Sequence, residues 1–446
     1  MNQEYMKTRK ILPLVLSMSL PMVISMAVNA LYNIVDSYFV AKISEDAMTA
    51  LALVFPVQNL VNAIVIGFAI GINARVAFYL GAKEEKLADE SASVGLLLNL
   101  IHGLVLALLC SAIMPSFLRM FTGDTQVIAL ACTYSTRVFA FAPVIGLELA
   151  YEKIFQAVGR MKVSMICMML GCVTNIILDP VMIFGLGPVP KLGIAGAAYA
   201  TGIGQCVTLA GYLLFYFARP MHVKVNVANM KTTGSVMKNI YTIGIPATLN
   251  LALPSIQVSA LNAILAPFPG SYILVLGVYY KLQTFIYLTA NGIVQGIRPL
   301  VGYNYGAKNE KRLKNILKFS YLFEIGLGLL FTIIMCIFAP QIIKVFMDKP
   351  DIITNGAMML RFQQMGMIFM SVTLISTCVC QAVGNAGGAF VLSISRQGVI
   401  YVLALLIMSN VFGYTGVLVS QACSDVVTAL IAVGIMLRIM KKFIKN

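Results

Sequence analysis

Residues 11–40 read ILPLVLSMSLPMVISMAVNALYNIVDSYFV, and this stretch decides the class of fold. A helix that spans a membrane needs about 20 consecutive apolar residues, and this run exceeds that length. One carboxyl group, Asp36, interrupts it close to its end. We therefore expect residues 11–40 to form a membrane-spanning helix. A carboxyl group is unusual in such a helix, so we expect Asp36 to have partners or a function that account for it.

The composition of the whole chain agrees with a membrane protein. Of its 446 residues, 59% are hydrophobic and 11% are charged, whereas a soluble protein carries about 25% charged residues. The mean hydropathy is +0.88. Eleven more apolar runs follow, at residues 47–78, 91–114, 131–157, 162–184, 194–217, 236–265, 272–303, 315–338, 355–383, 387–409 and 414–440. The sequence predicts an all-α polytopic membrane protein with twelve transmembrane helices.

The basic residues are distributed unequally between the two sides of the predicted membrane protein. The net charge of +15 could suggest a nucleic-acid partner, but 24 of the 32 Lys and Arg, Arg396 among them, fall on the side with both termini. Five fall on the other side. Basic loops stay in the cytoplasm, so we expect both termini there, in a multi-pass protein of the plasma (inner) membrane. The basic residues would then meet membrane lipid, and no nucleic acid is expected to bind.

The two halves of the chain match each other at a constant offset in residue number. Gly81-Ala-Lys-Glu-Glu-Lys86 aligns with Gly306-Ala-Lys-Asn-Glu-Lys311, and Gln156-Ala-Val-Gly159 aligns at the same offset with Gln381-Ala-Val-Gly384. The offset covers six spans, an even number, so both halves start on the same side and form parallel repeats. Such repeats build transporters whose substrate site lies between the halves.

The repeat predicts two six-helix lobes. It continues after a shorter late loop in the second half, where Gly193-Ile-Ala-Gly196 aligns with Gly413-Tyr-Thr-Gly416. The expected division is an N-terminal lobe at 1–218, a cytoplasmic linker at 219–238 and a C-terminal lobe at 239–446.

Asp36 has expected partners in two other spans of the first lobe. Asp179 lies about five residues from the outer end of its span, and Thr201 about seven residues below the start of the next. Asn175 and Asp179 are four residues apart and share one helical face, as do Asn33 and Asp36, which are three apart. We therefore expect one cluster at similar depth that contains Asp36, Asn175, Asp179 and Thr201, with Asn33 nearby.

The chemistry of this cluster suits cation exchange. Two close carboxylates in a low-dielectric site cannot both stay ionised, so the pair would share a proton. Alternatively, the carboxylate, amide and hydroxyl oxygens would bind Na⁺, a hard ion that prefers oxygen ligands. No other metal is expected. A purely structural hydrogen-bonded clamp between helices is the competing interpretation.

Three further features are interpreted with alternatives. Pro21 lies mid-span and predicts a kink, which would act either as a hinge or as a static bend. Glu148 and Glu152 would either attract a cationic substrate or pair with Lys153 or Arg160. Met26 and Met182 lie in spans that border the first-lobe cavity, where soft side chains adapt to varied ligands, although simple packing would also explain them.

Three motifs resemble those of one transporter family. They are Asn33-Ile-Val-Asp36, Asn175-Ile-Ile-Leu-Asp179-Pro180 and Gln295-Gly-Ile-Arg-Pro-Leu-Val-Gly-Tyr-Asn-Tyr-Gly306. Together with the duplicated Gln-Ala-Val-Gly, they are similar to the multidrug and toxic compound extrusion (MATE) family. The resemblance implies export of organic cations, driven by inward H⁺ or Na⁺, through a V-shaped cleft between the lobes. It also implies a coupling network on Asp36, Asn175, Asp179 and Thr201.

The chain departs from some members of that family in its second lobe. The seventh, eighth, tenth and eleventh predicted spans contain no Asp or Glu; they are residues 236–265, 272–303, 355–383 and 387–409. The expected coupling therefore lies in the first lobe alone. A lipid-linked precursor flippase of the same superfamily is the nearest alternative function, and a membrane-embedded enzyme is a more distant one. No P-loop is present, so we expect an ion gradient rather than ATP to drive transport. We expect a monomer with no catalytic residues and no cofactor.

Overall fold

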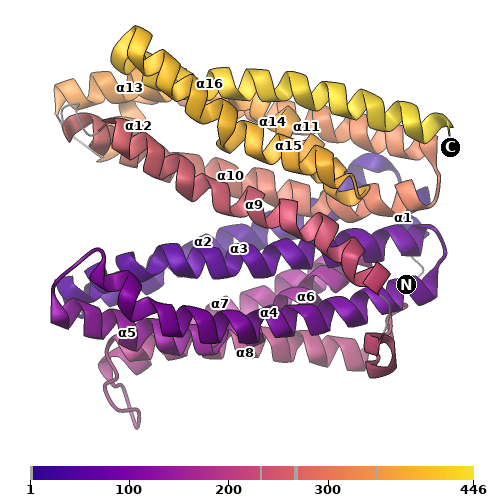
Figure 1. Cartoon of the computed structure of the whole chain (residues 1–446), viewed down its shortest axis with the longest axis horizontal. Coiled ribbons are helices and arrows are strands. Elements are labelled where there is room, and N and C mark those ends of the chain that lie inside the picture. The colour runs from indigo at the N-terminus through magenta and orange to yellow at the C-terminus, as the bar shows by residue number, and fades with distance from the viewer. Residues whose placement is uncertain (1–3, 232–233, 266–269, 347–348, 446) are drawn as a thin grey trace.

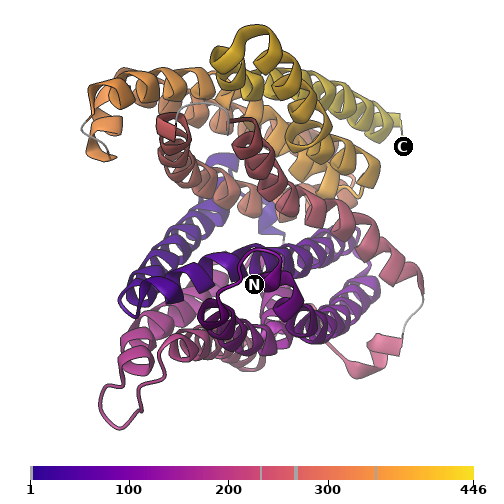
Figure 2. The ribbon, with the colours of Figure 1, turned by 60° about the vertical axis from the view of Figure 1, so that its left-hand side comes forward.

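The structure is a computed structural model that describes residues 4–231, 234–265, 270–346 and 349–445, and every regular element in these ranges is a helix. The helices form two bundles, α2–α8 and α9–α16, which we call the first and second lobes (Figures 1 and 2). Both termini lie at one end of the molecule, which we call the termini side, and the opposite end is the far side (Figure 1).

The first lobe follows a short N-terminal helix and leads into a single 3-10 turn. The helix before it is α1 (Tyr5–Thr8), and the 3-10 turn after it is η1 (Val227–Lys231). The lobe itself contains α2 (Ile11–Ala41), α3 (Glu45–Gly81), α4 (Glu85–Arg119), α5 (Thr125–Ala140), α6 (Ala142–Ala157), α7 (Met161–Phe184) and α8 (Ile194–Ala218). The second lobe contains α9 (Gly234–Leu265), α10 (Gly270–Gly306), α11 (Glu310–Ile337), α12 (Ala339–Phe346), α13 (Pro350–Gln364), α14 (Met367–Ala382), α15 (Ala386–Gln397) and α16 (Val399–Lys445). The proposed limits of the linker, 219–238, stay a prediction.

These helices account for the twelve expected spans. Among the described residues, seven helical segments are long and apolar enough to cross a membrane, and the bent pairs α5–α6 and α13–α14 each supply one more. One of the seven, Ala386–Ile444, has 59 residues and would be about 90 Å long, nearly three bilayer cores. It breaks at Gly413, where φ is 57°, and therefore makes two spans. α9 and α10, which match α2 and α3 in length, complete the set.

The backbone confirms the parallel repeat. The α5–α6 pair and the α13–α14 pair both bend by 43°. Gly159 and Gly384, which end the two Gln-Ala-Val-Gly motifs, have φ of 80° and 79°. Gly193 and Gly413, which begin the later pair of aligned motifs, have φ and ψ of 57° and −134° and of 57° and −135°. Glycine adopts positive φ without a steric cost, so the same turns recur in both lobes at the positions that the sequence alignment predicts.

The lobes meet through contacts that the repeat duplicates. A Cβ atom added to Gly81 would lie 1.9 Å from the carbonyl oxygen of Tyr303, and one added to Gly306 would lie 2.1 Å from that of Phe78. Gly306 is the repeat partner of Gly81, and Tyr303 is the repeat partner of Phe78. One backbone contact is therefore made twice, at the termini-side ends of α3 and α10.

A second duplicated contact lies nearer the middle of the helices. A Cβ on Gly67 of α3 would lie 2.6 Å from the backbone nitrogen of Thr248 in α9, and one on Gly292 of α10 would lie 2.7 Å from that of Val23 in α2. These pairs are again repeat equivalents. Only glycine allows the backbones to approach so closely, so the termini-side halves of α2, α3, α9 and α10 hold the lobes together.

Candidate cation-coupling site

The four residues expected to form the cluster lie close to the far side of the first lobe. Asp36 lies five residues before the end of α2, Asp179 five before the end of α7, and Thr201 seven after the start of α8. At about 1.5 Å per residue, all three are roughly 8–10 Å from their helix ends. Asp179 and Asn175 are 0% and 2% exposed, and Asp36 and Thr201 are each 8% exposed. The side chains therefore face the protein interior and not the acyl chains.

Asn175 connects α7 to α8. With its amide oriented to satisfy both of its polar atoms, Nδ2 donates to Asp179 Oδ2 at 3.2 Å, and Oδ1 accepts from the backbone nitrogen of Thr201 at 3.1 Å. In this orientation the amide oxygen also lies 3.3 Å from the Thr201 hydroxyl oxygen. The side chains of Asn175, Asp179 and Thr201 are therefore in direct contact.

Asp36 approaches this group from α2, which packs against α7. Asp36 and Asp179 are close enough for the charge of one to act on the other. Among the described residues, no hydrogen-bond partner reaches the buried Oδ1 of Asp36. A buried carboxylate oxygen without a donor is costly, and a proton or a metal cation bound to this oxygen would offset the cost.

Two tyrosines border the carboxylates. Tyr32 and Tyr134 each lie within electrostatic range of both Asp36 and Asp179. The sequence analysis does not include them, although Tyr32 precedes Asp36 by four residues and so shares its helical face. Tyr134 lies on α5, and no spacing in the sequence links it to the cluster.

Asn33 is not brought to the cluster. Its side chain is exposed, and its amide nitrogen donates to the carbonyl oxygen of Asn29 at 2.8 Å. The three-residue spacing to Asp36 places both residues on neighbouring positions of α2, but the Asn33 side chain bonds within its own helix.

Helix α2 connects the cluster to the second lobe. It continues without interruption through Pro21, whose carbonyl oxygen accepts from the Ser25 hydroxyl at 2.8 Å. On the termini side of Pro21, the Ser19 hydroxyl donates to the carbonyl oxygen of Ile293 in α10 at 3.3 Å. One half of α2 therefore packs on α10, while the other half presents Asp36 to α7.

A second polar network joins the lobes on the termini side. Lys153 Nζ lies 2.9 Å from Glu152 Oε1 and 2.9 Å from Gln295 Oε1 of α10. Gln156 Nε2 donates to the same two oxygens, at 2.5 Å and 3.3 Å. Glu152 and Lys153 are 1% and 3% exposed. Of the two interpretations of Glu152, the structure shows the pairing with a neighbouring lysine.

The remaining predicted residues are buried or half-buried in the first lobe. Glu148, one turn before Glu152, is 5% exposed, and its Oε2 has no hydrogen-bond partner among the described residues. It interacts electrostatically with Glu152 and with Tyr32. Met26 on α2 and Met182 on α7 are half-buried. Glu148 is therefore within electrostatic range of Glu152 in the interlobe network and of Tyr32 on the helix that carries Asp36.

The second lobe contains a buried ion pair that the sequence analysis misses. Arg396 Nε lies 2.9 Å from Asp425 Oδ1, both side chains are nearly fully buried, and Gln421 Nε2 donates to the same oxygen at 3.1 Å. Arg396 also donates to the hydroxyl of Tyr287. Counting Arg396 among the loop charges was therefore wrong, because it lies inside a span, where the carboxylate of Asp425 from the following helix neutralises it.

Comparisons with known proteins agree with this architecture. The family model described as MatE matches residues 21–181 and 246–406, two segments related by the offset of the internal repeat. The chain is 26% identical over 435 residues to "Multidrug export protein MepA" of Staphylococcus haemolyticus, with 97% of this chain and 94% of the relative covered.

Two solved structures have the same fold. A MOP superfamily transporter from Pyrococcus furiosus is 22% identical with a TM-score of 0.92, over 100% of this chain and 99% of that one. A structure titled "Outward-facing conformation of a multidrug resistance MATE family transporter of the MOP superfamily" is 23% identical with a TM-score of 0.91, over 99% and 98%. The family model covers most of the chain in both of its halves, and the chain therefore belongs to the MatE family of multi-pass membrane transporters.

Proposed function

We propose that this protein exports organic cations in exchange for inward-moving H⁺ or Na⁺, with Asp36 and Asp179 as the coupling pair. It would work as a monomer in the plasma membrane with both termini in the cytoplasm. The observation that carries the proposal is the buried pair of carboxylates, one of which has an oxygen that no described donor reaches. Multidrug export by the staphylococcal relative supports the class of substrate.

The energetics of the pair explain how an ion drives the cycle. Two ionised carboxylates away from water repel each other, and each lacks the hydration that it has in solution. A bound H⁺ or Na⁺ removes part of this cost. Binding of the ion therefore lowers the free energy of the conformation in which Asp36 lies against α7. An ion gradient can therefore favour one conformation over the other.

The pattern of contacts between the lobes supports loading from the far side. The glycine contacts and the Lys153–Gln295 hydrogen bond lie on the termini side or near mid-helix, and they close that side. The cluster lies beyond them, toward the far side. With the termini in the cytoplasm, this is the form that admits the ion from outside and releases the drug there.

Helix α2 transmits a change of charge at Asp36 to the contacts between the lobes. Its far-side half carries Asp36 to α7, and its other half bonds α10 through Ser19. A change of charge on Asp36 alters the packing of the first half, and Pro21, which lacks an amide hydrogen, lets the two halves bend relative to each other. The interlobe contacts of α2 would loosen as the cation leaves.

The experiment uses inside-out vesicles, ethidium in the outer solution, and a pH gradient or a sodium gradient imposed separately. We expect ethidium to accumulate with at least one gradient, and Asp36→Asn or Asp179→Asn to abolish this accumulation. Glu84→Gln, an exposed carboxyl on the termini side, is the matched control and should transport normally. Full accumulation by both amide variants would refute the coupling role of the pair.

A further inference from the structure

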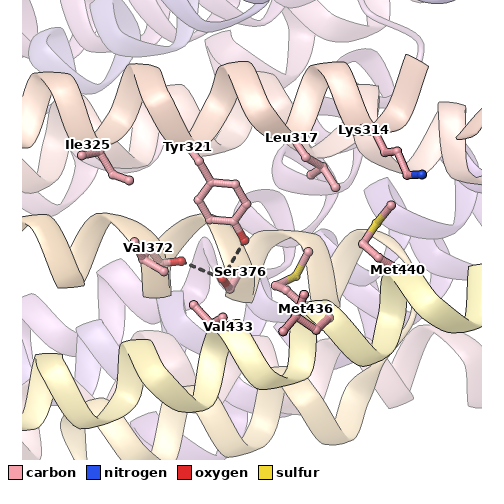
Figure 3. Close-up of a pocket in the computed structure, with 10 residues that line it drawn as sticks. Lys314, Leu317, Tyr321, Ile325, Val372, Ser376, Val433, Met436 and Met440 are labelled. Atoms are coloured by element: carbon pink, nitrogen blue, oxygen red, sulfur yellow. Dashed lines mark hydrogen bonds between the residues drawn. The ribbon is translucent and has the colours of Figure 1, made fainter. Parts of the chain in front are cut away.

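A groove on the second lobe has no part in the transport scheme. It has a volume of about 380 Å³ and lies between α11, α14 and α16 (Figure 3). That volume falls within the roughly 300–1,000 Å³ that is typical of small-molecule sites. Leu437 and Val433 at its edge are 67% and 47% exposed, so the groove opens outward to the surface that the membrane covers.

The length of the groove matches one leaflet of a bilayer. On α11 the lining begins at Lys314, in the second turn on the termini side, and ends at Ile325. These residues are eleven positions apart, which is about 16 Å along a helix. Half of the hydrocarbon core of a bilayer is about 15 Å thick. The groove therefore extends from the headgroup level to roughly the middle of the membrane.

The walls of the groove suit a hydrocarbon chain. Leu317, Val372, Met436 and Met440 line it, and the methionines project into it (Figure 3). The hydroxyl groups of Tyr321 and Ser376 lie 2.7 Å apart and bond to each other, and Ser376 also donates to the carbonyl oxygen of Val372 at 2.7 Å. These polar atoms already have partners, so the lining offers no polar group that needs a ligand. Flexible methionines allow it to accept chains of different shape.

The termini-side end of the groove is positively charged. Lys314 lies at this end, and its ammonium group pairs with Glu310 on the exposed surface, where an ion pair contributes little. Lys318 follows one turn later on α11, and Lys441 follows Met440 on α16; both are exposed. Three lysines against one glutamate leave an excess of positive charge at the level of the lipid headgroups, which attracts anionic lipid.

From this combination we infer that the groove binds a phospholipid with an anionic headgroup, in the leaflet on the termini side. One acyl chain lies along the groove, and the phosphate lies against Lys314. The site belongs to the second lobe and does not involve Asp36 or Asp179, so it stands or falls independently of the coupling mechanism.

The test is native mass spectrometry of the full chain, purified in mild detergent and titrated with phosphatidylglycerol or with phosphatidylcholine of the same acyl chains. We expect the protein to retain phosphatidylglycerol more strongly. Val433→Phe should fill the groove and reduce retention of both lipids. Val427→Phe is the matched control, because Val427 lies on the same helix, is 44% exposed and is not part of the groove lining.

A second variant separates the headgroup from the chain. Lys314→Gln should lower the preference for phosphatidylglycerol over phosphatidylcholine by about fivefold, since one lysine near the membrane surface contributes about 1 kcal/mol. Lys86→Gln, an exposed lysine of the first lobe, should not change this preference. All four substitutions are at exposed positions, and equal melting temperatures would establish that the variants fold.

Two results would overturn the inference. The first is equal lipid retention by Val433→Phe and Val427→Phe, which would mean that no lipid chain occupies the groove. The second is displacement of the retained lipid by ethidium together with weaker ethidium binding by Val433→Phe, which would make the transported cation the occupant.

Discussion

Substitution of Gly81 tests whether the contacts between the lobes control the conformational equilibrium. In Gly81→Ala the new Cβ would lie 1.9 Å from the oxygen, 2.7 Å from the carbon and 2.9 Å from the Cα of Tyr303. All three are backbone atoms, so no side chain can rotate away to make room. Because contacts below 3.0 Å are not tolerated, the two helices must separate by about 1 Å.

The cost of this overpacking is about 1–3 kcal/mol. It applies only where α3 touches α10, that is, in the form that is closed on the termini side. The opposite form loses this contact and avoids the penalty. The equilibrium should therefore shift toward opening on the termini side by about 5- to 150-fold.

The assay is a distance measurement by double electron–electron resonance in lipid nanodiscs. Spin labels on unnatural amino acids at Lys86 and Lys311, exposed repeat equivalents in the two lobes, report the separation on the termini side. We expect a larger population at long distance in Gly81→Ala. Gly434→Ala is the control, because no described atom lies within 4 Å of its added Cβ. Identical distance distributions in Gly81→Ala and Gly434→Ala would refute the reasoning.

Three further predictions concern the buried polar residues and Pro21. Arg396→Met should lower the melting temperature, because leaving Asp425 buried without its partner costs about 3–5 kcal/mol. The double variant Arg396→Met with Asp425→Leu should recover most of the loss, and a double variant no more stable than the single one would contradict this. Asn175→Leu should remove a hydrogen bond to Asp179 worth about 1.5–3 kcal/mol and should therefore weaken cation binding in a sodium or proton titration. An unchanged affinity for the cation would show that the amide has no role in cation binding. Pro21→Ala should slow ethidium transport in vesicles while the protein remains folded, and an unchanged rate would exclude a hinge in α2.

Much of the architecture could be predicted from the sequence because the membrane restricts the choice. Apolar runs of sufficient length must be helices, and six spans per repeat must give parallel halves. The equal φ angles of Gly159 and Gly384 confirm the offset that the Gln-Ala-Val-Gly motif indicates. Within the candidate site, the four-residue spacing of Asn175 and Asp179 correctly places both on one face of α7, where their side chains are in contact.

Contacts between distant elements could not be predicted in the same way. The Arg396–Asp425 pair depends on how α15 packs against α16, and local spacing carries no information on that packing. Asn33 has a favourable spacing to Asp36, but the rotation of α2 leaves its side chain exposed. The sequence offers Lys153 as a partner for Glu152, but it does not reveal Gln295, which approaches Lys153 from the other lobe. These features are decided by tertiary packing.

The exchange of an ion for a drug at one carboxylate pair is tested most directly by the release of the ion itself. Purified protein in weakly buffered detergent solution would receive ethidium, while a pH dye and a sodium electrode record what leaves the protein. Binding of ethidium should release H⁺ or Na⁺ from the wild type, and no ion from the variant that combines Asp36→Asn with Asp179→Asn. Ethidium binding without any ion release from the wild type, or the same release from the double variant, would contradict the account.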